Sequence, residues 1–134
     1  MTLKRLTKED IRKDSGTFNP VGHIVIALAD DAVAAQAAAE LHAAGFGAED
    51  VLSYTSPEII TRLREMVHTA SQAAGFGYEI TLMRRYLALA EGGAGWLIVY
   101  APEDAAAQRV AEVATRLKAS SAVHYHRLAN EDLV

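Results

Sequence analysis

The chain has 134 residues, a length that suits one domain, and its 51% hydrophobic and 22% charged residues are ordinary for a globular protein. Its net charge of −4 argues against binding to the nucleic-acid backbone as the main function. The chain contains no cysteine, which excludes disulfides, thiol nucleophiles, iron–sulfur ligation and most structural zinc sites.

Residues 1–20 form an N-terminal leader in which basic residues outnumber acidic ones. A nucleic-acid-binding arm is one interpretation, but dispersed charges make a weak phosphate contact, so we expect a mobile leader anchored through Leu3, Leu6 and Ile11. The leader lacks the apolar segment of a secretory signal, and the longest apolar run, residues 24–29, is too short to cross a bilayer. We therefore expect a cytoplasmic protein that contacts neither membrane nor nucleic acid.

The remaining residues, 21–134, are expected to form a single domain that opens with a strand–helix–strand unit. The β-branched run at 22–29 predicts a buried strand. Asp30 can cap the helix that follows over 32–44, because its side chain can accept hydrogen bonds from free N–H groups of the first turn. A second strand is predicted at 51–55.

An insertion at 56–93 follows this unit and has the apolar spacing of helices. Ser56 and Pro57 are typical of a helix start, and residues 78–91 predict a second inserted helix. The sequence AAGFG occurs twice, at 43–47 and 73–77. Both copies follow helices, so they indicate helix ends and not a phosphate-binding loop.

A second strand–helix–strand unit closes the chain, with a strand at 95–101, a helix at 102–118 and a last strand at 122–128. It aligns with the first unit, so that Val51 falls on Val123. We therefore predict an α+β fold, a ferredoxin-like split βαβ sandwich (duplicated βαβ) with a helical insertion between its two units. Its sheet would have four antiparallel strands in the order 4-1-3-2. A doubly wound parallel sheet is the alternative.

Both faces of the first and third predicted strands are apolar, although a two-layer sandwich covers only one of them. Either the inserted helices or a second subunit must cover the other face. We expect a homodimer, with the insertion contributing to its interface.

Three histidines form the most suggestive candidate site. His124 and His126 lie two residues apart in the last strand and so share one face, and an antiparallel neighbour would bring His23 close to them. Such a group could bind a divalent metal or assist proton transfer. The other interpretation is a set of half-exposed edge-strand residues. It is favoured because the same strands provide no carboxylate to complete a metal site.

The candidate ligand-binding residues are therefore His23, His124, His126 and Tyr54, the last at the end of the second strand. No residue is assigned a catalytic role, since serine-nucleophile motifs are absent and the paired acids lie at helix starts. No cofactor is expected.

Two stretches of the sequence resemble a family. VGHIVIALADDAVAAQAAAELHAAGFGAEDVLSYT resembles the first βαβ unit of bacterial general-stress or heat-induced-stress small domains, and GWLIVYAPEDAAAQRVAEVATRLKASSAVHYHRL is similar to their second half. The insertion at 56–93 departs from the shorter glycine-rich linker of that pattern. The resemblance implies a cytosolic, non-enzymatic role linked to stress, with no catalytic residues.

Two functional hypotheses follow. The first is a non-catalytic, dimeric stress-associated or regulatory module that binds a protein partner or a small ligand. The alternative is a small metal- or ligand-dependent enzyme that uses His23, His124 and His126.

Overall fold

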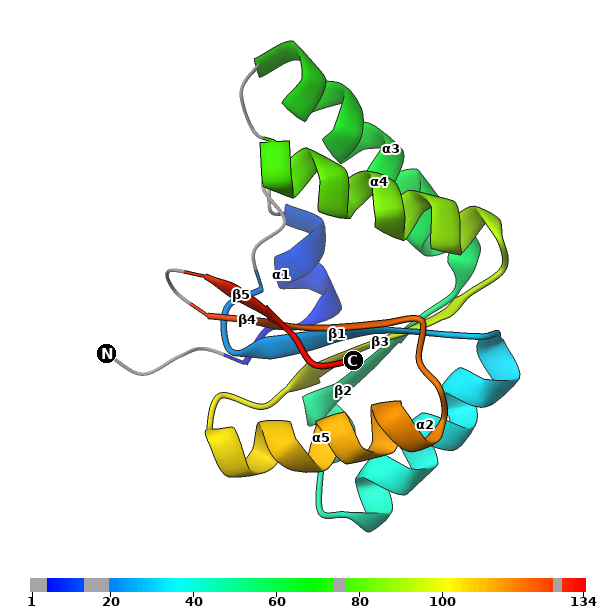
Figure 1. The fold of residues 1–134 in the computed structure, drawn as a ribbon, viewed down its shortest axis with the longest axis vertical. Coiled ribbons are helices and arrows are strands. Elements are labelled where there is room, and N and C mark those ends of the chain that lie inside the picture. Colours follow the sequence, from blue (N-terminus) through cyan, green and yellow to red (C-terminus); the bar gives the residue numbers. More distant parts are fainter. Residues whose placement is uncertain (1–4, 14–19, 74–76, 127–128) are drawn as a thin grey trace.

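The computed structural model describes residues 5–13, 20–73, 77–126 and 129–134, and it shows an α+β fold built on one antiparallel sheet (Figure 1). The elements run, in chain order, as α1 (Lys8–Lys13), β1 (His23–Leu28), α2 (Asp31–Ala43), the 3-10 turn η1 (Ala48–Asp50), β2 (Val51–Tyr54), α3 (Ser56–Ala73), α4 (Gly77–Glu91), β3 (Gly95–Tyr100), α5 (Asp104–Arg116), β4 (Ser121–Tyr125) and β5 (Asn130–Asp132).

The sheet has the strand order β2-β3-β1-β4-β5, and every neighbouring pair is antiparallel. The order of the first four strands agrees with the predicted 4-1-3-2, and the antiparallel pairing excludes the parallel alternative. The prediction of a four-stranded sheet is wrong, because β5 folds back beside β4. Its residues Asn130, Glu131 and Asp132 have low strand propensity, so the sequence gives no strand signal there.

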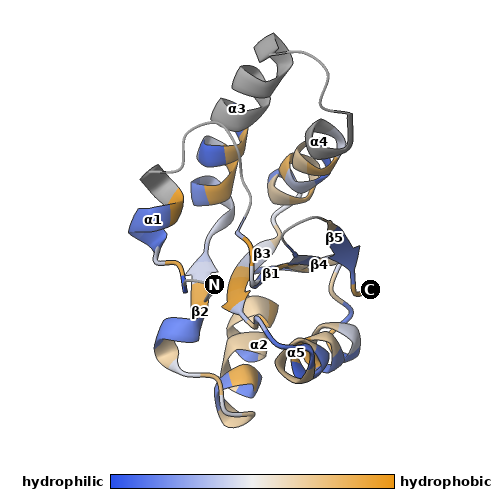
Figure 2. Cartoon of the chain, turned by 90° about the vertical axis from the view of Figure 1, so that its left-hand side faces the viewer, coloured by the Kyte–Doolittle hydropathy of each residue, from blue (hydrophilic) through white to orange (hydrophobic). Residues whose placement is uncertain are grey.

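Helices cover both faces of the sheet (Figures 1 and 2). Helices α2 and α5 pack on one face, where Ile24 and Ile26 of β1 point. Helices α1, α3 and α4 lie on the other face, which receives Val25 and Ala27. Each face has its own hydrophobic core, which explains why β1 is apolar along both sides. The inserted helices therefore cover the second face within the chain itself.

Two local features fix the first strand–helix connection. The side chain of Asp30 accepts a hydrogen bond from the Val33 N–H at 2.9 Å, which caps α2 as predicted. Gly95 begins β3 directly against this turn, and a Cβ atom at Gly95 would lie 2.7 Å from the Cβ of Ala34. Only glycine lets the backbones of β3 and α2 approach this closely.

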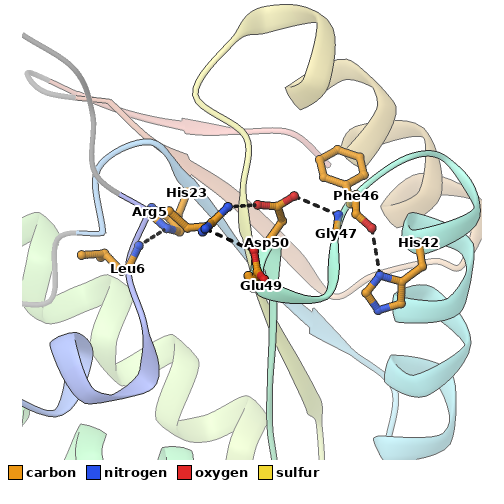
Figure 3. Close-up of polar contacts among 8 residues, drawn as sticks. All are labelled: Arg5, Leu6, His23, His42, Phe46, Gly47, Glu49 and Asp50. Carbon is orange, nitrogen blue, oxygen red and sulfur yellow. Dashed lines mark hydrogen bonds and ion pairs between the residues drawn. The ribbon is translucent and has the colours of Figure 1, made fainter.

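The short N-terminal segment at 5–13 packs against the body through the apolar side chains of Leu6 and Ile11. Both had been expected as anchors, whereas Leu3 lies outside the described residues. Arg5 adds ion pairs with Asp50 at 3.1 Å and Glu49 at 3.3 Å (Figure 3). The segment thus reaches η1 and β1 together. None of the helices in the described part of the chain combines the length and the apolar character that a bilayer crossing requires.

Candidate functional site

The register of the sheet separates the three candidate histidines. His124 lies opposite Ile24 in the β1–β4 pair, so it shares the face covered by α2 and α5. His23 is one residue earlier on β1 and therefore points to the opposite face, beneath α1. The predicted group of His23 with His124 and His126 does not form. The strand pairing was predicted, but a shift of a single residue decides which face each side chain takes.

His23 is a buried residue with both ring nitrogens engaged. Its exposed fraction is 1%, and its Nδ1 lies 3.1 Å from the Val21 carbonyl oxygen. The Leu6 N–H donates to Nε2 at 3.1 Å, so Nε2 must be the unprotonated nitrogen and Nδ1 the donor (Figure 3). Burial lowers the pKa of His23 below 6.5, which favours this neutral form. With its lone pair occupied, His23 holds the N-terminal segment and offers nothing to a ligand.

His124 and His126 do come together, and β5 adds a carboxylate to them. Glu131 lies opposite His124 in the β4–β5 pair, and His126, the residue that directly follows β4, has its ring beside that of His124. The two imidazole centroids are 4.2 Å apart, and His126 Nε2 lies 3.1 Å from Glu131 Oε1. One ligand atom from each of the three residues lies within 4.8 Å of the other two. This cluster of His124, His126 and Glu131 is called the hairpin cluster below.

Within the hairpin cluster, His124 is the fixed member. It is 2% exposed, and burial together with the neighbouring His126 lowers its pKa below 6.5. The carbonyl oxygen of Ala101 accepts a hydrogen bond from its ring. The side chains of His126 and Glu131 are exposed by 42% and 59%, so the cluster opens to solvent on that side.

Tyr54 lies on the other face of the sheet, at a cavity of about 40 Å³ between the sheet, α1, α3 and α4. Its walls are mainly apolar side chains such as Val25, Leu63 and Ile98. Ile11 forms the part of the cavity wall that α1 contributes. This space is called the α1 cavity below.

Within the part of the chain that the structure describes, the Tyr54 hydroxyl and the Trp96 indole Nε1 are buried at the α1 cavity without a hydrogen-bond partner. Buried polar groups are paired in most proteins, so each such atom calls for an explanation. Burial is the main cause that raises the pKa of Tyr54 to about 12, and the charge of Glu58 adds to it. The hydroxyl is therefore a proton donor at neutral pH. The Trp96 N–H can only donate.

Charged side chains surround the same cavity and connect it to α1. Lys8 lies 4.4 Å above the centre of the Tyr54 ring, and its Nζ is 3.6 Å from a carboxylate oxygen of Glu58. Arg62 also lines the cavity and donates from Nη2 to the Ile11 carbonyl oxygen at 3.2 Å. The contacts of Lys8 and Arg62 hold α1 in place over the α1 cavity.

The sequence analysis did not identify three residues of the hairpin cluster and the α1 cavity as site residues. Glu131 lies in β5, whose polar residues gave no strand signal. Trp96 was expected in the core, and nothing in a strand pattern tells that its N–H lacks a partner. Arg62 was missed because its contact with α1 could not be predicted from the helical pattern.

No protein-family model matches the chain, and neither a curated protein nor a solved structure does. The resemblance to general-stress domains therefore stays a prediction. The α1 cavity and the hairpin cluster are the two candidate sites of the protein.

Proposed function

We propose that the protein is a non-catalytic module that binds a small carboxylate in the α1 cavity. The observation that carries this proposal is a pair of buried donors at one cavity, the Tyr54 hydroxyl and the Trp96 N–H, which have no partner among the described residues. A ligand that supplies acceptor oxygens would satisfy both donors, whereas an apolar ligand would leave them unpaired.

The charges around the cavity favour an anionic acceptor. Arg62 lines the cavity and carries a fixed positive charge. The negative charge of Glu58 is offset by Lys8, with which it forms an ion pair. A carboxylate head group near Tyr54 and Trp96 would therefore meet two hydrogen-bond donors and one cation, while its hydrocarbon part contacts the apolar wall.

The volume of the cavity limits the ligand to a few atoms. A cavity of about 40 Å³ has room for roughly three water molecules, since each needs about 10–15 Å³. The proposed class is therefore a short-chain monocarboxylate, from acetate to butyrate. Water alone is the competing occupant, and the experiment below separates the two.

The test uses Trp96, the single tryptophan of the chain, as a fluorescent reporter. Titration with butyrate should change its emission and saturate, and butyramide, which has the same shape without the charge, should bind more weakly. Tyr54→Phe removes only the hydroxyl and should weaken butyrate binding at least about tenfold, since one hydrogen bond to a charged group contributes about 1.5–3 kcal/mol.

Tyr100→Phe is the matched control, because it removes a tyrosine hydroxyl that is not part of the cavity wall. It should leave butyrate binding unchanged. A linear response that never saturates would indicate that water alone occupies the cavity. Equal binding of butyrate to the parent protein and to Tyr54→Phe would show that the ligand does not use the Tyr54 hydroxyl, and it would contradict the proposal as well.

The finer fold assignment, the assembly state and the cellular role are also proposals. The strand order and the two strand–helix–strand units support a ferredoxin-like fold with duplicated βαβ units. The homodimer, the link to stress and the cytoplasmic location stay predictions of the sequence. The apolar second face of β1 no longer argues for the dimer, because α3 and α4 pack against it.

A further inference from the structure

We propose that the hairpin cluster of His124, His126 and Glu131 binds one divalent transition-metal ion, such as Zn²⁺ or Ni²⁺. This inference is independent of the proposed carboxylate binding, since the two sites lie on opposite faces of the sheet.

The β4–β5 hairpin preorganises the three side chains. Glu131 and His124 form a directly opposite pair, whose Cβ atoms lie about 4.5–5.5 Å apart in antiparallel sheets. The His126 ring lies beside that of His124. The backbone N–H of His126 donates to the Ala129 carbonyl oxygen at 2.9 Å, which holds the two strands of the hairpin together. One residue of β4, the residue that directly follows β4 and one residue of β5 thus meet without any contribution from a distant part of the chain.

The distances suit a metal after small side-chain rotations. Ligands bound at about 2.0–2.1 Å in a tetrahedral site lie roughly 3.4 Å from one another. The distance of 3.1 Å between His126 Nε2 and Glu131 Oε1 is already close to this value. The largest separation between the three ligand atoms is within 4.8 Å, and the exposed side chains of His126 and Glu131 are free to rotate toward His124.

The surroundings of His124 are those of a metal ligand. The Ala101 carbonyl oxygen accepts a hydrogen bond from one ring nitrogen, which keeps the proton there and orients the ring. Metal-bound histidines commonly make such a contact to a carbonyl or carboxylate. One ring nitrogen of His124 is among the three ligand atoms of the hairpin cluster.

The ligand set selects the kind of ion. Two imidazoles and one carboxylate favour Zn²⁺, Ni²⁺, Co²⁺ or Cu²⁺, whereas Mg²⁺ and Ca²⁺ prefer oxygen ligands. The chain has no cysteine that could compete for the same ions. A simple ion pair between His126 and Glu131 is the competing explanation, and it makes no use of the buried His124.

The experiment is calorimetric titration of the metal-free, untagged full chain with Zn²⁺ and Ni²⁺. One ion per chain is expected, and Mg²⁺ at the same concentration should give no binding. His126→Gln and Glu131→Gln each remove one ligand from an exposed position that makes no core contact, so both variants should fold. Each should lower the Zn²⁺ affinity by at least about tenfold.

His42→Gln is the matched control, because His42 is an exposed histidine of α2 outside the cluster. It should bind Zn²⁺ like the parent protein, and so should Tyr54→Phe. Absence of Zn²⁺ binding would overturn the proposal, and so would Zn²⁺ binding that is unchanged in both ligand variants. A loss that appears only in His42→Gln would assign the ion to another part of the protein and overturn it equally.

Discussion

At the scale of single residues, His23 shows how a histidine can be fixed by its two hydrogen bonds. Its Nδ1–H and Nε2 are both used, one by the Val21 carbonyl oxygen and one by the Leu6 N–H. Protonation of Nε2 would remove the acceptor and place a charge in a buried position. The Tyr100 ring packs beside it, and the other titratable group that acts on it is His124 across the sheet. Low pH should therefore loosen the N-terminal segment first.

The free energy of unfolding should depend on pH in a defined way. The pKa of His23 and that of His124 are both lowered from 6.5 in the folded state, so the unfolded chain binds these protons more tightly. These two groups should therefore leave stability unchanged above about pH 6.5 and lower it as the pH drops below that value. Each of the two protons contributes a slope of up to about 1.4 kcal/mol per pH unit.

His23→Gln isolates one of these two protons. The glutamine oxygen can still accept from the Leu6 N–H, but the side chain does not titrate. Urea unfolding between pH 5 and pH 7, followed by Trp96 fluorescence, should show about half the pH dependence of the parent protein. An unchanged slope would mean that His23 does not titrate on unfolding.

At the scale of elements, the two core helices of the α2/α5 face begin differently. The Asp30 side chain caps α2, whereas Glu103 at the start of α5 makes no such hydrogen bond. Acidic residues lie at both helix starts, so composition alone does not distinguish the two. The difference follows from side-chain length, because the shorter aspartate suits the N-cap position better than glutamate.

Asp30→Ala should therefore lower the free energy of unfolding by about 1 kcal/mol, a typical cost of losing an N-cap. Glu103→Ala is the control and should change stability by less than about 0.5 kcal/mol, as exposed substitutions usually do. Chemical denaturation of both variants at pH 7 measures the difference. Equal losses in the two variants would contradict the assignment of the cap to Asp30.

At the scale of the whole molecule, the strands and helices with strong apolar periodicity were predictable. The strands predicted at 22–29, 51–55 and 95–101 correspond to β1, β2 and β3 within two residues. Their order followed from the internal repeat. The candidate sites were harder to predict from the sequence. They depend on the sheet face to which each side chain points and on elements whose residues show little strand or helix pattern. Glu131 of β5 and Lys8 of α1 are the clearest cases, since only tertiary contacts give them a role.

The strand order also has a consequence for how the chain folds during its synthesis. The central strand β1 hydrogen-bonds to β3 and β4, and its neighbour in sequence, β2, pairs with β3 at the edge of the described sheet. The most apolar strand of the N-terminal half must therefore stay unpaired on the ribosome until residues 95–100 have emerged. Such late pairing slows folding and exposes the nascent chain to aggregation. A fragment of residues 1–94 should consequently show no cooperative thermal transition by circular dichroism, while the full chain does.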